Sequence, residues 1–173
     1  MKIVVVGAGS WGTAFACLLR DNGHDVTLAA RDAAQVDVIN ATGRNPRYAQ
    51  TANLAGIVAA PIPDAPFAAA ELVVVAVPSR VFGDVVAALP GDAPLVSLTK
   101  GLDPATGARL STLVSGRPVA VLSGPNIAEE IVRGLPAAAV VASDDLELAV
   151  RLQVAVHSVL FRVYVSDDMT PPC

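Results

Sequence analysis

Short, uninterrupted runs of apolar residues alternate along the chain with segments in which apolar residues recur at helical spacing. The runs do not alternate polar and apolar positions, which is typical of strands buried on both faces of a parallel sheet. Prolines and glycines end most of these segments. The expected strands are 3–6, 25–30, 57–60, 72–77, 95–99, 119–122, 137–142 and 161–165, and the expected helices are 11–20, 32–42, 67–71, 80–89, 108–114, 127–133 and 145–156.

Strands and helices alternate nearly to the end of the chain, which predicts an α/β fold with a doubly wound, mainly parallel sheet of the Rossmann type. The chain of 173 residues is long enough for one domain with a substantial core and short for two. We therefore expect a single domain over 1–168, followed by a short irregular tail at 169–173.

The first expected strand runs directly into Gly7, Gly9 and Gly12, which have the spacing G-x-G-x-x-G. Gly7 would permit the tight turn out of the strand, Gly9 would let a phosphate approach the backbone, and Gly12 would let the helix pack close to the strand. The N-terminus of that helix would then face a pyrophosphate. The strand and helix on either side favour a dinucleotide site over a glycine-rich turn without a ligand.

Several polar residues follow the ends of other expected strands, namely Arg31, Pro78-Ser79, Lys100 and the S-G-P-N segment at 123–126. In doubly wound sheets, ligands bind outside the carboxyl ends of the strands. We therefore expect these residues to gather with the glycine turn at one edge of the sheet. Ser79 is also placed to cap the helix that follows it.

The choice between the two nicotinamide cofactors depends on the tip of the second strand. An acidic residue there would bind the ribose 2′-hydroxyl of NAD, whereas an arginine can pair with the 2′-phosphate of NADP. Arg31 favours NADP, and Asp32, which follows directly, leaves NAD open.

Lys100 is a cation placed just past an apolar strand. A lysine there can hold a phosphate or carbonyl oxygen and stabilise developing negative charge, although its position alone also fits an ordinary surface lysine. Asn126 offers an amide at the start of a helix, where it could equally be an N-cap. His24 and His157 are isolated, and we expect structural roles for both.

Composition narrows the class of protein. The chain is 53% hydrophobic, 16% charged and carries a net charge of −4, which gives no support to nucleic-acid binding. No apolar run is long enough to span a bilayer. The two cysteines, Cys17 and Cys173, indicate neither a disulfide framework nor a metal site, so a reduced, cytoplasmic protein is expected.

Taken together, the motifs resemble the N-terminal cofactor-binding domain of NAD(P)-dependent glycerol-3-phosphate dehydrogenases. The resemblance covers almost the whole chain. It rests on G-A-G-S-W-G-T-A at 7–14, N-P-R-Y at 45–48, V-A-V-P-S at 75–79, S-L-T-K-G-L at 97–102, S-G-P-N-I-A-E-E at 123–130 and F-R-V-Y-V-S-D-D at 161–168.

The resemblance implies hydride transfer between NAD(P)H and dihydroxyacetone phosphate or sn-glycerol 3-phosphate, for glycerophospholipid synthesis. Lys100 would then lie between cofactor and substrate and stabilise the alkoxide-like oxygen, with Gly124 and Asn126 at the substrate. The cofactor would contact Gly7, Gly9, Ser10, Trp11, Gly12, Arg31, Tyr48, Pro78, Lys100 and Ala128. No metal is implied.

In the family pattern, the segment after F-R-V-Y-x-x-D-D continues to a lysine that donates or accepts the proton, and then to a helical substrate domain. This sequence closes instead with M-T-P-P-C at 169–173. We therefore expect the chain alone to bind cofactor with little turnover, and to associate with itself through apolar surface left uncovered. Two alternatives stay open: a 6-phosphogluconate- or ketopantoate-reductase-like dehydrogenase domain, and a truncated, non-catalytic nucleotide-binding module.

Overall fold

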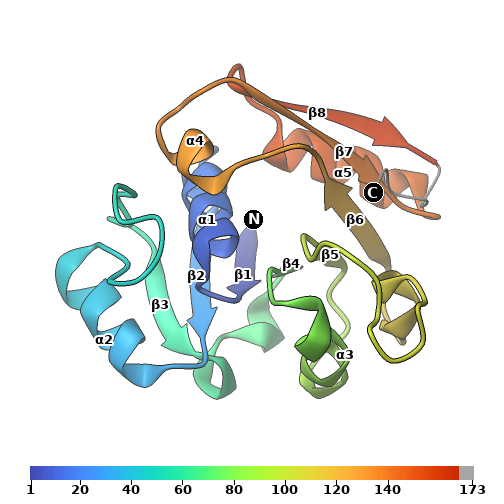
Figure 1. Cartoon of the computed structure of the whole chain (residues 1–173), viewed down its shortest axis with the longest axis horizontal. Coiled ribbons are helices and arrows are strands. Elements are labelled where there is room, and N and C mark those ends of the chain that lie inside the picture. The colour runs from blue at the N-terminus through green and yellow to red at the C-terminus, as the bar shows by residue number, and fades with distance from the viewer. Residues whose placement is uncertain (168–173) are drawn as a thin grey trace.

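A computed structural model of the chain describes residues 1–167 (Figure 1), so the predicted domain end at 168 and the tail at 169–173 lie outside the described residues. The strands of this part form one sheet with the order β3-β2-β1-β4-β5-β6-β7-β8. They are β1 (Lys2–Val6), β2 (Asp25–Ala30), β3 (Val58–Pro61), β4 (Leu72–Val75), β5 (Leu95–Ser97), β6 (Val119–Ser123), β7 (Ala137–Ala142) and β8 (Phe161–Ser166).

Helices follow most of the strands, which confirms the alternating α/β pattern. The α-helices are α1 (Ser10–Asp21), α2 (Ala33–Thr42), α3 (Ser79–Ala88), α4 (Ala128–Val132) and α5 (Leu146–Val156), and the short 3₁₀ helices are η1 (Ile62–Asp64), η2 (Phe67–Ala69) and η3 (Leu110–Leu113). No helix in residues 1–167 is both long enough and apolar enough to cross a membrane.

The sheet is parallel from β3 to β6, as the sequence predicts for most of it. The exception is β7, which pairs antiparallel with β6, while β8 runs parallel to β7. A parallel crossover needs a connection that returns along the sheet, usually a helix, and the five-residue α4 is too short for that return. The carboxyl ends of β1, β2, β4, β5 and β6 therefore share one edge.

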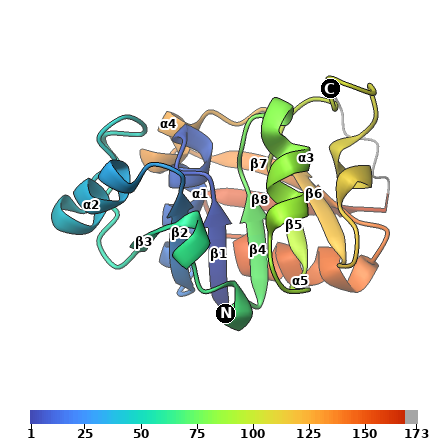
Figure 2. The same ribbon diagram turned by 90° about the horizontal axis from the view of Figure 1, so that it is seen from below.

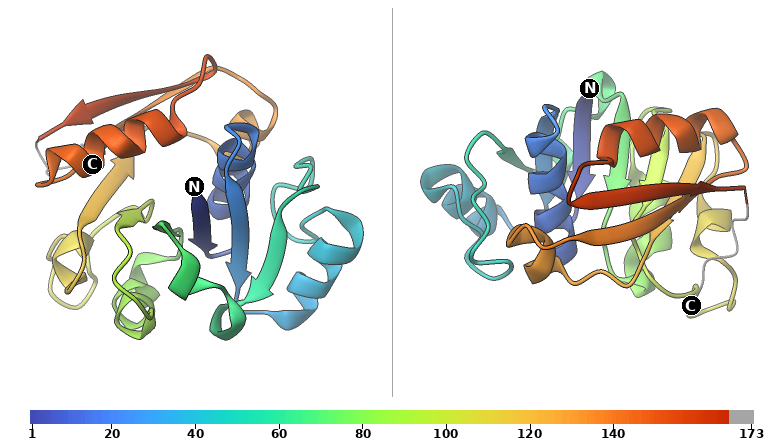
Figure 3. Two further views of the ribbon diagram at one scale, coloured as in Figure 1. Left: turned by 180° about the vertical axis from the view of Figure 1, so that it is seen from behind. Right: turned by 90° about the horizontal axis from the view of Figure 1, so that it is seen from above.

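The core lies on both faces of the sheet, because successive side chains of each buried strand point to opposite sides. Ile3 and Val5 of β1 pack with residues of α1 and α5. Val4 and Val6 pack instead with Phe82 of α3 and with residues around η2 and η3. Figure 2 shows α3 over β4 and β5, and the right panel of Figure 3 shows α1 and α5 on the opposite face.

Several local expectations were wrong. The strand expected at 72–77 ends at Val75, and the strand expected at 95–99 ends at Ser97. The segment expected as a helix at 108–114 forms only η3, because Arg109 is held in an isolated β-bridge with Leu102 and Gly116 follows at positive φ. Ser79 does not cap α3 but is its first residue, and Pro78 occupies the cap position without a side-chain hydrogen bond.

Candidate functional site

The glycine turn between β1 and α1 is shaped by close backbone approaches. Gly7 has φ of +111°, and a Cβ there would overlap the carbonyl oxygen of Ala76. A Cβ on Gly12 would overlap the carbonyl oxygen of Gly7. Only glycine satisfies these contacts, because the first turn of α1 packs directly on the turn that precedes it.

Gly9 differs from both of its neighbours in the motif. A Cβ built on Gly9 would meet no atom within 4 Å, so the space over this residue is open. Gly9 is also the N-cap of α1, which has no side-chain hydrogen bond at its cap and no acidic residue in its first turn. An uncapped helix N-terminus beside open space suits a phosphate group, because its N–H groups and positive dipole end favour an anion.

A cleft of about 300 Å³ opens beside this helix end. Five of the residues that the sequence nominated line this cleft, and they come from three separate parts of the chain: Ser10, Trp11, Lys100, Asn126 and Ala128. The complete lining consists of Ser10, Trp11, Ala76, Val77, Leu98, Thr99, Lys100, Asn126 and Ala128. The cleft therefore lies at the carboxyl ends of β1, β4, β5 and β6, where the fold predicts a ligand.

Lys100 stands on the loop after β5 and extends its ammonium group toward the S-G-P-N segment. Its Nζ donates a hydrogen bond to the carbonyl oxygen of Gly124 at 3.1 Å. The preceding Thr99 fixes the loop, because its hydroxyl donates to the carbonyl oxygen of Val77 at 2.8 Å. Lys100 is exposed, and its hydrogen bond links the loop after β5 to the segment after β6.

Asn126 places an unpaired amide at the cleft. Its Nδ2 is buried and has no hydrogen-bond partner within residues 1–167, although a buried donor without a partner is costly. A Cβ on Gly124 would come within 2.6 Å of this Nδ2 and of the carbonyl oxygen of Ala138, so only glycine fits there. The N-cap alternative for Asn126 was wrong, because the cap of α4 is Ile127.

Arg31, Tyr48 and Pro78 do not line the cleft. All three are exposed, and Arg31 comes directly after β2, as predicted.

Asp32, next to Arg31, is the N-cap of α2 and accepts hydrogen bonds from the backbone N–H groups of Ala34 and Gln35. It also forms an ion pair with Arg47, 2.6 Å from Nη2 to Oδ2. Desolvation is the largest influence and raises the pKa of Asp32, but the hydrogen bonds from Gln35 and Ala34 and the charge of Arg47 together lower it below its ordinary value.

Asn45 is a structural residue that our sequence reasoning did not single out. Its side chain is buried, with 1% exposed, and its Nδ2 donates to the carbonyl oxygen of Ala8 at 3.0 Å and to the hydroxyl of Thr13 at 2.8 Å. The side chain of Gln35 donates to the same Ala8 oxygen and to Asn45 Oδ1. Asn45 thus joins the glycine turn, α1 and α2.

The same Oδ1 of Asn45 also accepts hydrogen bonds from the backbone N–H groups of Arg47 and Tyr48, at 3.0 and 3.2 Å. The loop that carries Arg47 and Tyr48 is therefore set relative to the glycine turn by one side chain. The motif N-P-R-Y marked this loop, but a polar residue in a loop gives no periodic signal that would distinguish a buried asparagine from an exposed one.

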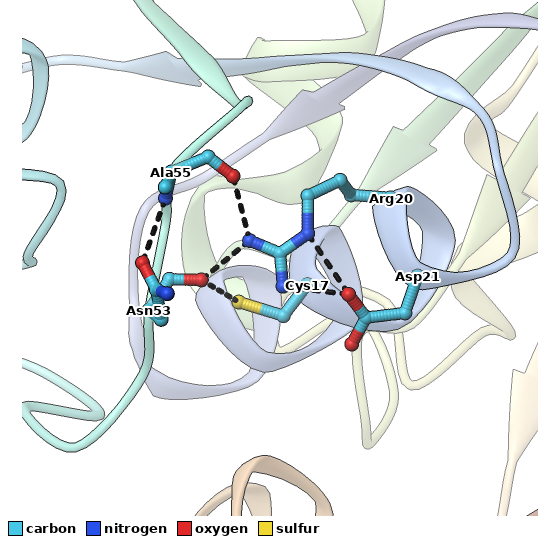
Figure 4. Close-up of polar contacts among 5 residues, drawn as sticks. All are labelled: Cys17, Arg20, Asp21, Asn53 and Ala55. Atoms are coloured by element: carbon cyan, nitrogen blue, oxygen red, sulfur yellow. Dashed lines mark hydrogen bonds and ion pairs between the residues drawn. The ribbon is translucent and has the colours of Figure 1, made fainter.

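The far end of this loop is fastened to α1 (Figure 4). Nη1 of Arg20 donates to the carbonyl oxygens of Asn53 and Ala55, at 2.5 and 2.9 Å. Asp21 holds the same guanidinium in place with hydrogen bonds of 2.9 and 2.7 Å. The thiol of Cys17 lies 3.6 Å from the carbonyl oxygen of Asn53, so the loop packs along one side of the helix.

The remaining candidates for chemistry have structural partners. His24 Nε2 lies 2.9 Å from the carbonyl oxygen of Ala155, and His157 Nδ1 accepts a hydrogen bond from the backbone of Val163. Within residues 1–167, no group of three or more His, Cys, Asp or Glu side chains is arranged to hold a metal.

Comparisons with known proteins agree with the resemblance seen in the motifs. A family model described as NAD-dependent glycerol-3-phosphate dehydrogenase N-terminus matches residues 2–149. The glycerol-3-phosphate dehydrogenase (NAD(P)+) of Stenotrophomonas maltophilia is 40% identical over 186 residues, covering 97% of this chain and 52% of the relative. The enzyme of the same name from Nitrosococcus oceani is 42% identical, covering 98% of this chain and 52% of the relative.

Among solved structures, the chain is similar to glycerol-3-phosphate dehydrogenase from Coxiella burnetii. The TM-score is 0.90 at 32% identity, over 97% of this chain and 54% of that one. A ketopantoate reductase family member from Ralstonia eutropha is less similar, with a TM-score of 0.64 at 25% identity, over 97% of this chain and 57% of that one. The chain spans about half the length of the curated relatives it matches. It belongs to the family of NAD(P)-dependent glycerol-3-phosphate dehydrogenases, whose N-terminal, NAD-binding part it matches.

Proposed function

We propose that this chain is the cofactor-binding part of a glycerol-3-phosphate dehydrogenase, which transfers a hydride between NAD(P)H and dihydroxyacetone phosphate or sn-glycerol 3-phosphate. The observation that carries the proposal is the cleft in which Lys100 and Asn126 face the N-terminus of α1. A cytoplasmic location and self-association stay predictions.

The chain's residues fit a dinucleotide. The open space over Gly9 and the uncapped start of α1 suit the pyrophosphate, with Ser10 and Trp11 at its side. Ala128 borders the same cleft, and we propose it as a further cofactor contact. Arg31 and Tyr48 would extend the site toward the adenosine end. Pro78 lies beside Val77, which lines the cleft, and completes the proposed cofactor set with Gly7 and Gly12.

The nicotinamide, when bound, supplies or accepts the hydride. Lys100 would hold the substrate's carbonyl oxygen and stabilise the negative charge that grows on it, an effect that exists mainly in the transition state. The unpaired Nδ2 of Asn126 would donate a hydrogen bond to a substrate oxygen, which would remove the cost of leaving it unpaired. Gly124 keeps the space that this amide needs.

The binding half of the proposal can be tested with a built-in probe. Trp11 is the single tryptophan of the chain and lines the cleft, so NADPH bound there should quench its fluorescence. We expect saturable quenching by NADPH, competed by NADP+. Quenching that rises linearly without saturation would mean that no such site exists.

The catalytic half is tested in a full-length member of the family that carries this cofactor-binding part, because the proton-transfer lysine that the resemblance implies lies in a motif that residues 1–173 do not contain. We expect that protein to oxidise NADPH with dihydroxyacetone phosphate but not with ketopantoate, and the 173-residue chain to show little turnover. Lys100→Ala should lower kcat by about 100-fold or more. Lys2→Ala is a matched control, because Lys2 is the chain's other lysine and stands at the opposite end of β1. Equal effects of both variants would remove Lys100 from the reaction.

A further inference from the structure

The ion pair between Asp32 and Arg47 lies where the sequence left the choice of cofactor open. Asp32 is one residue beyond Arg31 and the tip of β2. A carboxylate in this region of a Rossmann sheet commonly binds the ribose hydroxyls of NAD, and it would repel the 2′-phosphate of NADP. The effect of Asp32 on the cofactor therefore depends on what its two oxygens already bind.

Both oxygens of Asp32 are occupied by the protein. Oδ1 accepts hydrogen bonds from the N–H groups of Ala34 and Gln35, at 3.0 and 3.4 Å. Oδ2 is 2.6 Å from Nη2 of Arg47. A ribose hydroxyl would have to compete with a charged partner for Oδ2, so Asp32 is poorly suited to act as the acceptor that selects NAD.

Arg47 is held in position but keeps donors free. Its backbone is fixed by the buried Asn45, while its side chain is 58% exposed. A guanidinium has five N–H donors in a rigid fork, and the contact with Asp32 engages Nη2. The side chains of Arg31, Asp32 and Arg47 together carry a net charge of +1. Without Arg47, the net charge of the other two would be zero.

We propose that Arg47 is a specificity-determining residue, which neutralises Asp32 and so gives the adenosine end of the site its preference for a 2′-phosphorylated cofactor. This inference rests on the proposed binding of a nicotinamide dinucleotide. Arg31 alone would face a neighbouring carboxylate of opposite charge. With Arg47 paired to that carboxylate, the cationic charge of Arg31 remains available to a phosphate.

The test measures binding of NADPH and NADH through quenching of Trp11 fluorescence, and needs no turnover. Arg47→Gln should weaken NADPH binding about tenfold or more and change NADH binding far less. Asp32→Asn added to Arg47→Gln should restore much of the NADPH affinity, because it removes the charge that Arg47 neutralises. Asparagine is also a good N-cap, so α2 should keep its start.

Arg44→Gln is the matched control. Arg44 lies in the same exposed loop and contacts the carbonyl oxygen of Gln50 rather than Asp32, so it should leave the ratio of NADPH to NADH affinity unchanged. The proposal is overturned if Arg47→Gln weakens both cofactors equally, if Arg44→Gln matches it, or if Asp32→Asn gives no recovery. Failure of the unmodified chain to bind either cofactor would instead reject the proposed function.

Discussion

The glycine turn at 7–12 and the loop at 45–55 border the same proposed cofactor site, yet they are held in opposite ways. The turn depends on missing side chains, because Gly7 and Gly12 let backbone approach backbone. The loop has no regular structure and depends on side chains, with buried Asn45 at one end and Arg20 at the other. The glycine contacts can be recognised from the spacing G-x-G-x-x-G in the sequence. The side-chain contacts cannot, because they join residues that are distant along the chain.

The largest expected effect concerns the turn. Gly12→Ala should destabilise the fold by more than about 3 kcal/mol, because the added methyl group overlaps the carbonyl oxygen of Gly7 and backbone cannot easily move. Denaturant unfolding followed by circular dichroism measures it. Gly83→Ala in α3 is the control: its Cβ would come no closer than 3.4 Å, to Leu113 Cδ1, and alanine favours helix, so stability should stay equal or rise. A stable Gly12→Ala protein would contradict the steric explanation.

The loop should respond to loss of its buried asparagine. Asn45→Ala removes five hydrogen bonds and leaves buried groups without partners, so we expect a loss of about 2–4 kcal/mol. Asn53→Ala serves as control, because Asn53 is exposed and its Oδ1 accepts only the N–H of Ala55. If both variants unfold at the same denaturant concentration, Asn45 does not hold the loop.

Gly9 should separate binding from stability. Gly9→Ala adds a methyl group that meets no protein atom, and the backbone, with φ of −78°, accepts alanine. Alanine is a poorer N-cap than glycine, so stability should fall by about 1 kcal/mol at most, while affinity for NADPH should fall about tenfold as the methyl group enters the space proposed for the pyrophosphate. Unchanged affinity would show that the phosphate lies elsewhere.

The smallest effect concerns the thiol beneath the loop. Burial raises the pKa of Cys17 to about 11, against 9.0 for an ordinary thiol, while Arg20 lowers it and Asp21 raises it. Because the folded pKa is the higher one, the stabilisation is complete below pH 9 and is lost as the pH rises toward 11. Stability should therefore fall from pH 8 to pH 10 by about 1 kcal/mol more in the unmodified chain than in Cys17→Ala. If the stabilities of the unmodified chain and of Cys17→Ala changed equally with pH, the thiol would be in contact with water rather than buried.

Apolar patterning predicted every strand of the described sheet, and gave the bounds of β2 and β7 as observed. Residues at strand ends also led to Lys100 and Asn126, which do meet in one cleft, because parallel strands bring their carboxyl ends together. The reversal of β7 could not be predicted in this way, since a buried strand has the same composition in either direction. Asn45 was missed because its partners Ala8 and Thr13 lie 37 and 32 residues away.

Strands that are apolar on both faces raise a question about alignment during folding. If β1 were shifted by one residue relative to its neighbouring strands, one apolar side chain would take the place of another on both faces of the sheet. The burial of apolar surface would therefore hardly oppose the shifted register. Gly7 makes the shifted register unfavourable. Its N–H pairs with the carbonyl oxygen of Ala29 and its missing Cβ admits the oxygen of Ala76, and a slip would place Val6 or Ala8 at that point. The turn that is proposed to bind the cofactor's phosphates therefore also fixes the register of β1 at the centre of the sheet.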